Sequence, residues 1–201
     1  RAIMPVHLFG QSCDLVALQA FASAHRIRIV EDAAQSMGAR WQGRSTMSVG
    51  DLGTTSFFPS KNLGGMGDSG LVTTSDDALA DRARIFRVHG MQPKYYHREV
   101  GANFRMDPLQ AALLHLKLPH LPEYNCARAG NANFYHAALK GQAGIAENRP
   151  GVEATAKILL PVDFSGQGIW NQFTIRVTGG RRDALKAFLT ARKIGCEIYY
   201  P

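Results

Sequence analysis

Short apolar runs alternate with helical repeats of apolar residues through the first part of the chain. The runs at residues 6–9 and 27–30 have the length and apolar character of buried strands. Between them, apolar residues recur every three or four positions after Asp14, a favourable N-cap, which predicts a helix ending near His25. A strand, a helix and a strand at this spacing predict a βαβ unit and therefore a parallel sheet.

The same alternation continues to about residue 140. A loop or short hairpin is expected at 38–51 and a loop at 90–101, where no periodicity is evident. Asp107 and Pro108 have the signature of an N-cap and a first helical residue, and Pro119 should end the helix that they begin. Strands are predicted at 54–58 and 71–74, and helices at 76–88, 108–118 and 122–139.

The pattern loosens between residues 141 and 168, where glycines and prolines are frequent. It then predicts a strand at 171–177, a helix from about 182 to Gly195, and a strand at 196–200. A strand–helix–strand unit of this size cannot bury both faces alone. We therefore expect residues 1–140 to form one α/β domain and residues 141–201 to begin a second, truncated domain.

Composition excludes some classes of function. The chain has 201 residues, of which 45% are hydrophobic and 19% charged, as in ordinary globular proteins. It has no run of 18 apolar residues, so we expect no membrane span. The net charge is +7, but the positive residues are dispersed and not gathered in a stripe with aromatic residues. We therefore expect no nucleic-acid partner; dispersed charge fits anionic small molecules or a solvated surface equally well.

The cysteines and histidines point to no metal site. Cys13, Cys126 and Cys196 lie far apart, and an odd, scattered set indicates free thiols in a reducing compartment, so we expect a cytoplasmic protein. The seven histidines show no metal-ligand spacing.

The stretch 54–70 carries the strongest chemical signal. A β-prone run stops at Pro59, Lys61 follows almost at once, and four glycines occur within residues 64–70. A lysine held where water is scarce has a lowered pKa, because burial disfavours the ammonium form. The neutral amine can attack a carbonyl carbon and form a Schiff base. The alternative is an ordinary surface lysine in a loop.

Three glycines of this stretch imitate a dinucleotide-binding turn. Gly65, Gly67 and Gly70 match the spacing G-x-G-x-x-G, but a strand is predicted after them where that motif requires a helix. We therefore reject a dinucleotide site.

Asp32 and Gln35 follow the strand predicted at 27–30. Ligands of open α/β sheets bind beyond the carboxyl ends of the strands, which makes Asp32 a candidate functional residue. The alternative is that Asp32 only caps the following turn.

Several motifs, taken in order, resemble the DegT family of nucleotide-sugar aminotransferases, which are fold type I enzymes that use pyridoxal phosphate (PLP). They cover about the first 140 residues, and NQFTIRV, RRDAL and EIYYP near the end resemble the start of the family's small domain. The motifs are VHLFGQ (6–11), VEDAAQSMGA (30–39), GDLGTTSFFPSKNLGGMGDSG (50–70), RVHG (87–90) and GANFRMDPLQAALLHLKL (101–118). The resemblance implies a mostly parallel sheet with flanking helices, as in the large domain of these enzymes, whose N-terminal part would precede Arg1.

The resemblance also implies a role for five residues. Lys61 matches the lysine that links covalently to PLP and moves the proton, and Asp32 matches the carboxylate that faces the pyridine nitrogen. Gln35 matches the amide beside the ring hydroxyl, and Ser56 matches a hydroxyl donor to the phosphate. Asn103 matches a residue that reaches the phosphate from the neighbouring subunit, which implies a homodimer with shared active sites.

The implied activity is transamination of a UDP- or dTDP-linked keto-hexose, with glutamate as amino donor, in amino-sugar or polysaccharide biosynthesis. The motifs lean towards amination of a 3-keto position. A family branch with histidine in place of the lysine catalyses dehydration, and Lys61 argues against it. An inactive homologue and a regulatory, DNA-binding protein are two further hypotheses. Asp68 and Ser69 depart from the family's usual glycine turn, which leaves Lys61 untouched.

Overall fold

The computed structural model describes residues 1–152 and 155–201. The chain divides into two compact units, residues 1–128 with 165–171, and residues 129–164 with 172–201. The boundary expected near residue 141 remains a prediction. None of the helices in the described ranges is long and apolar enough to cross a membrane.

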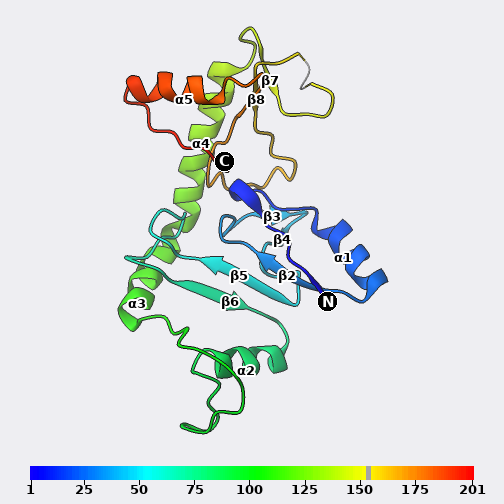
Figure 1. The fold of residues 1–201 in the computed structure, drawn as a ribbon, viewed down its shortest axis with the longest axis vertical. Helices are drawn as coiled ribbons and strands as arrows, with labels where there is room; N and C mark the ends of the chain where they lie inside the picture. Colours follow the sequence, from blue (N-terminus) through cyan, green and yellow to red (C-terminus); the bar gives the residue numbers. More distant parts are fainter. Residues whose placement is uncertain (153–154) are drawn as a thin grey trace. The chain divides into compact units, whose positions relative to one another are not determined.

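The first unit is organised around a four-stranded sheet in the order β1-β2-β5-β6 (Figure 1). Its strands are β1 (Ala2–Ile3), β2 (Arg28–Asp32), β5 (Leu52–Ser56) and β6 (Gly70–Thr73). Strands β1, β2 and β5 are parallel, and β6 is antiparallel to β5. A parallel strand–helix–strand arrangement is confirmed. The strand predicted after the glycines is confirmed as well, because β6 begins at Gly70, where a dinucleotide-binding motif requires a helix.

The strand predicted at 6–9 is wrong. Val6 forms only an isolated bridge with Asp32, and a 3₁₀ turn, η1 (Leu8–Gly10), follows it. Phe9 and Gly10 have φ angles of 59° and 96°, so the chain turns there and cannot continue as a strand. The parallel partner of β2 is instead the short β1, which lies closer to the N-terminus and is too short for an apolar pattern to indicate.

Side-chain caps begin three helices of this unit where the sequence predicts them. Asp14 accepts hydrogen bonds from Val16 N and Ala17 N at 3.1 and 3.0 Å, and the same device begins α2 and α3 at Asp76 and Asp107. A hairpin of β3 (Arg40–Trp41) and β4 (Arg44–Ser45) confirms the expectation for 38–51. The helices are α1 (Leu15–His25), α2 (Asp77–Phe86) and α3 (Pro108–Lys117), and a 3₁₀ turn, η2 (Leu118–His120), leads into α4 (Leu121–Leu139).

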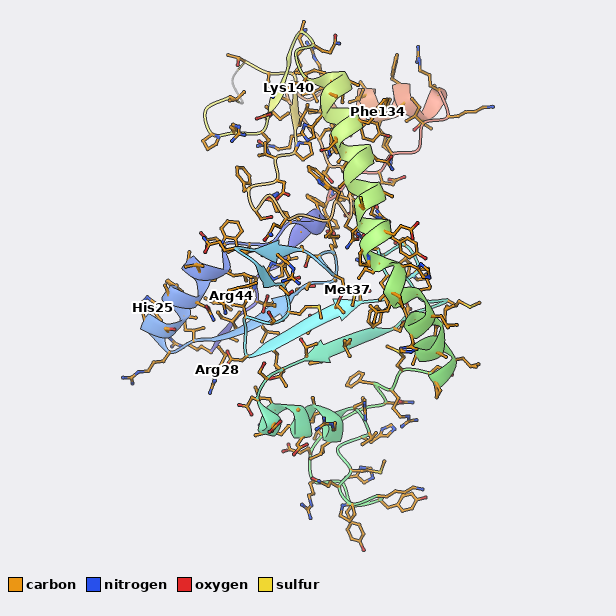
Figure 2. The ribbon with its side chains drawn as sticks, turned by 180° about the vertical axis from the view of Figure 1, so that it is seen from behind. His25, Arg28, Met37, Arg44, Phe134 and Lys140 are labelled. Atoms are coloured by element: carbon orange, nitrogen blue, oxygen red, sulfur yellow. The ribbon has the colours of Figure 1, made fainter. Side chains whose placement is uncertain are left out.

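A core cluster joins the segment after β5 to the helices α3 and α4. It consists of Phe57, Leu63, Leu114 and Leu121, each at most 7% exposed. Met37, labelled in Figure 2 beside the first part of α4, packs against this cluster. Burying each of these large side chains contributes about 1.5–3 kcal/mol. The cluster therefore fixes the chain around residue 61 to the two helices.

The segment 165–171 belongs to the first unit although it follows α4 in the chain. Ile169 N donates to Gly10 O at 2.9 Å, and Asn62 Nδ2 donates to Ile169 O at 3.3 Å. A Cβ atom on Gly10 would lie 2.6 Å from Asn171 N, so the close approach of the two backbones requires glycine.

The second unit contains a three-stranded sheet and the helix α5 (Arg182–Ala191). Its strands are β7 (Ile145–Glu147), β8 (Ile158–Leu160) and β9 (Arg176–Val177), with β7 parallel and β9 antiparallel to β8. The strand predicted at 171–177 shortens to β9, and the strand predicted at 196–200 is wrong. Both runs are β-prone, but a strand forms only where a neighbouring strand is available for pairing.

Candidate functional site

Asp32 ends β2, and the structure fixes its backbone from two sides. His7 N donates to Asp32 O and Asp32 N donates to Pro5 O, both at 2.9 Å. The Asp32 side chain is half-buried, and its Oδ1 accepts a hydrogen bond from Ala34 N at 3.0 Å. Asp32 therefore caps the turn after β2 and also presents a carboxylate at the carboxyl end of a parallel strand.

Lys61 lies in the turn that follows β5. Its backbone N donates to Phe58 O at 2.9 Å, and its side chain is half-buried. Burial lowers the pKa of Lys61 below its ordinary value, and the negative charge of Asp32 opposes this effect without cancelling it. The structure thus brings the two groups, from different strands, within electrostatic reach of each other.

Gln35 is oriented by the turn at residue 9. Gln35 Oε1 accepts a hydrogen bond from Phe9 N at 2.6 Å. This hydrogen bond fixes the orientation of the Gln35 amide, because only the oxygen of an amide group can accept a hydrogen bond. Phe9, in a left-handed conformation, therefore orients the Gln35 side chain, although the apolar pattern predicts a strand at this position.

Ser56 lies on the same face of the sheet as Asp32. Asp32 pairs with Thr54, and Ser56 follows two residues later in β5, so alternation places all three on one face. The Ser56 hydroxyl oxygen accepts a hydrogen bond from Phe58 N at 3.2 Å.

Asn103 is exposed and lies in a different part of the unit. Its Oδ1 accepts a hydrogen bond from Arg105 N at 3.3 Å, and its backbone bridges to Val88. In the part of the chain that the structure describes, it forms no hydrogen bond with Lys61 or Asp32. The structure therefore brings Lys61 within electrostatic reach of Asp32 and places Ser56 on the same face of the sheet as Asp32. Gln35 follows the end of β2, and Asn103 lies apart.

A buried pair on the opposite face of β2 was not predicted from the sequence. Glu31 Oε2 is 2.9 Å from His7 Nε2, and both side chains are fully buried. The Glu31 carboxylate also accepts hydrogen bonds from Met47 N, Val49 N and Gly50 N at 3.0, 2.8 and 2.6 Å. The available signal was alternation, because Glu31 shares a face with the apolar residues Ile29 and Ala33, and an acidic residue on an apolar face is buried only when it is paired.

Charge on this pair is fixed by its hydrogen bonds. Burial by itself raises the pKa of Glu31, but the hydrogen bonds from His7 and from the three amides lower it below the usual value, so Glu31 is ionised. Burial lowers the pKa of His7, whereas hydrogen bonds with Cys13 and Glu31 raise it to about 9. The raised pKa favours a protonated ring, whereas the hydrogen bond that Cys13 N donates to His7 Nδ1 at 3.0 Å requires a lone pair on that nitrogen. Because an N–H group cannot donate to a protonated nitrogen, the geometry decides between the two, and we assign the neutral tautomer that donates from Nε2 to Glu31.

The site offers an amine with a lowered pKa, a carboxylate near it, and an oriented amide. These groups suit covalent chemistry on a carbonyl carbon and the holding of a protonated ring nitrogen. In residues 1–152 and 155–201, no group of three or more histidine, cysteine, aspartate or glutamate side chains is arranged to hold a metal ion.

Several curated relatives match the whole of this chain. A protein from Streptomyces venezuelae named dTDP-3-amino-3,4,6-trideoxy-alpha-D-glucose transaminase is 42% identical over 201 residues, which are 49% of its own length. A protein from Geobacillus stearothermophilus named pleiotropic regulatory protein is 41% identical over 202 residues, which are 51% of its length. The chain thus spans about half the length of the curated relatives it matches.

Solved structures share the fold. Streptomyces venezuelae DesV, in complex with a ketimine intermediate, matches 96% of this chain and 48% of its own, with a TM-score of 0.84 and 41% identity. NtdA from Bacillus subtilis, with bound cofactor PMP, matches 100% of this chain and 44% of its own, with a TM-score of 0.83 and 28% identity. Residues 1–201 match the DegT/DnrJ/EryC1/StrS aminotransferase family along their whole length, and the chain belongs to that family.

Proposed function

We propose that the whole protein is a PLP-dependent aminotransferase that transfers an amino group from glutamate to a nucleotide-linked keto-sugar. The observation that carries this proposal is the pair of Lys61 and Asp32. Burial lowers the pKa of the Lys61 amine while Asp32 stays within electrostatic reach of it. An ordinary surface lysine shows neither feature.

The residues present fit PLP. PLP, when bound, supplies an aldehyde for a covalent link and a ring that withdraws electrons from the reacting carbon. Lys61 is the amine that makes this link, because its lowered pKa gives a larger neutral fraction. Asp32 holds the proton on the ring nitrogen, and the Asp32–Ala34 hydrogen bond keeps the carboxylate oriented.

Two further residues orient the cofactor in this proposal. Gln35 binds Phe9 N through Oε1, which directs its amide nitrogen away from that turn and suits a contact with the ring hydroxyl. Ser56 lies on the Asp32 face at the end of β5, from where its hydroxyl would donate to the phosphate. Ser56 can do so while accepting from Phe58 N, because a hydroxyl donates one hydrogen bond and accepts others.

The proposed substrate is a UDP- or dTDP-linked hexose with a keto group at carbon 3. The support is the relative from Streptomyces venezuelae, whose name specifies a dTDP-linked 3-amino sugar. A panel of UDP- and dTDP-linked 3-keto and 4-keto sugars, assayed with glutamate, decides the position that is aminated.

We also propose a homodimer in which Asn103 reaches the phosphate of the partner's site. The hydrogen bond of the Asn103 side chain lies within its own turn, and the residue is exposed. Large apolar side chains that a second copy would cover are exposed close to it in the chain, at Val100 and Phe104, and on α3, at Leu109 and Leu116. Met66, whose backbone N binds Gln110 of α3, is exposed as well.

Borohydride reduction tests the proposal. The whole protein, purified with PLP, is reduced and digested, and the modified peptide is mapped by mass spectrometry. We expect the label on Lys61, and Lys61→Arg should remove it. Label on another lysine overturns the assignment of roles.

A regulatory, DNA-binding function is the second candidate, because one relative is named a pleiotropic regulatory protein. It requires a concentrated basic surface to neutralise phosphates. Salt-dependent retention of duplex DNA by the whole protein favours this function, and indifference to DNA at low salt rejects it.

A further inference from the structure

The helix α3 binds the glycine turn that follows Lys61. Gln110 Oε1 accepts a hydrogen bond from Met66 N at 2.8 Å. Lys117 Nζ, two helical turns further on, donates to Gly64 O. Figure 1 shows α3 at the end of the sheet where β5 finishes and β6 begins, which is where this turn lies.

Glycines allow this close approach. A Cβ atom on Gly65 would lie 2.8 Å from Gln110 Oε1, and one on Gly67 would lie 3.0 Å from Gln110 Nε2. On the other side, a Cβ atom on Gly64 would lie 2.3 Å from Pro59 O. The turn is therefore packed between the residues just before Lys61 and the side chains of α3.

The two residues between Lys61 and the turn are also anchored. Asn62 Nδ2 donates to Asn125 Oδ1 of α4 at 2.6 Å. Leu63 is 3% exposed and packs in the core cluster with Leu114, which belongs to α3 itself. The segment 62–66 is thus attached to α3 or α4 along most of its length, and Lys61 is the first residue before it.

We propose that Gln110 and Lys117 are positioning residues that hold residues 64–66 against α3 and thereby keep the Lys61 amine half-buried and within reach of Asp32. Neither side chain is assigned a contact with substrate or cofactor. Their hydrogen bonds act on backbone atoms, so they set the path of the chain that carries Lys61. The inference rests on the proposed role of Lys61 as the reacting amine.

The contacts of the turn with α3 control how far water reaches the Lys61 amine in this proposal. Its amine is kept from full solvation by its surroundings, and Asp32 is the charged group that acts on it. When the turn is released from α3, water reaches the amine, and its pKa rises towards the ordinary value of 10.5.

The test uses the whole protein in its PLP-free form, so its readout does not depend on turnover. Acetic anhydride at limiting concentration labels lysines over a range of pH, and mass spectrometry of the Lys61 peptide gives the midpoint of its reactivity. Gln110→Met removes the acceptor for Met66 N without changing charge. We expect the midpoint to rise by about half a pH unit or more.

The matched control is Gln19→Met. Gln19 also bonds a backbone atom, since its Nε2 donates to Val49 O at 3.3 Å, but it lies on α1 away from the Lys61 turn. We expect no change in the Lys61 midpoint. Lys117→Arg keeps a donor for Gly64 O and should also leave the midpoint unchanged.

Hydrogen exchange at Met66 gives a second readout. Exchange of the Met66 amide should be at least about tenfold faster in Gln110→Met, because its acceptor is gone. Unchanged exchange, or faster exchange with an unchanged Lys61 midpoint, overturns the inference.

A milder variant covers the case in which Gln110→Met does not fold. Gly67→Ala pushes a methyl group against Gln110 Nε2 and should raise the midpoint in the same direction. Gly130→Ala is its control, because nothing lies within 4 Å of the added atom. Failure of the proposed function is recognised separately, because borohydride label away from Lys61 leaves these PLP-free measurements unaffected.

Discussion

The Asp32 carboxylate acts on the Lys61 amine across the carboxyl ends of two neighbouring parallel strands. Asp32 is the last residue of β2, and Lys61 follows the end of β5, the strand paired with β2. Burial lowers the pKa of Lys61, and Asp32 raises it by a smaller amount. The balance between solvation and one negative charge therefore sets the protonation of the amine.

Asp32→Asn should lower the pKa of Lys61 further. The substitution removes the negative charge that stabilises the ammonium form, so the remaining influence is burial. Competitive acetylation of the PLP-free whole protein measures the change. Asp68→Asn, an exposed site in the same glycine-rich stretch, serves as control, and a rise of the midpoint in Asp32→Asn contradicts the prediction.

Lys61→Arg should reduce transamination by about 10²–10⁴-fold, because the guanidinium stays protonated and can neither link to PLP nor carry the proton. Amino-group transfer from glutamate to a keto-sugar nucleotide is measured. Lys94→Arg, on an exposed loop, should keep near-normal turnover. Equal activity of the two variants would exclude Lys61 as the reacting amine.

Glu31→Gln should reduce the free energy of unfolding by about 3–5 kcal/mol, because the amide replaces a fully buried carboxylate that accepts hydrogen bonds from four donors. Chemical denaturation of the whole protein gives the midpoint of unfolding, from which the change in the free energy of unfolding follows. Glu123→Gln is the control, since Glu123 pairs with His120 at the surface. A loss no larger than that of the control would show that the buried pair adds nothing to stability.

At acidic pH, the free energies of unfolding of the wild-type protein and of Glu31→Gln should become equal. The folded-state pKa of Glu31 lies below its usual value of 4.5, so its stabilising contribution is complete above that pH. It is lost as the pH falls through the folded-state pKa. Denaturation midpoints of the two proteins, compared from about pH 7 to about pH 3, should converge only below about pH 4.5; a gap that widens with acid has the wrong sign.

Leu109→Arg should weaken self-association of the whole protein. Leu109 is 82% exposed on α3, so the change leaves the core intact while it places charge on the surface proposed to meet a second copy. Sedimentation velocity compares the variant with Val16→Arg, at an exposed residue of α1. A dimer that survives Leu109→Arg and dissociates with Val16→Arg would place the interface elsewhere.

Local signals in the sequence explain which parts of the fold could be predicted. Asp14, Asp76 and Asp107 cap helices with atoms from their own turns, so their effect needs no distant partner. The run at 6–9 and the run at 196–200 depend on partners elsewhere in the chain, and both predictions were wrong. Residues 145–147 and 158–160 are strands only because they pair with each other, and residues 158–160 pair with β9 as well.

The candidate site divides in the same way. Asp32 was visible because it ends an apolar strand, and Lys61 because it precedes a cluster of glycines. The bonds of Glu31 with His7 and of Gln110 with Met66 join residues 24 and 44 positions apart, and no periodicity records them. The contacts that hold the reacting groups in place are therefore less predictable than the groups themselves.

The return of residues 165–171 to the first unit has a consequence for how this protein is made. Asn62, the neighbour of Lys61, donates a hydrogen bond to the carbonyl of Ile169, and Ile169 N donates to the carbonyl of Gly10. During translation, the surroundings of the Lys61 amine stay incomplete until residues 165–171 have left the ribosome. An expression fragment that stops after Arg128 would lack these residues as well, so any shortened version intended to preserve the amine's environment has to extend through Asn171.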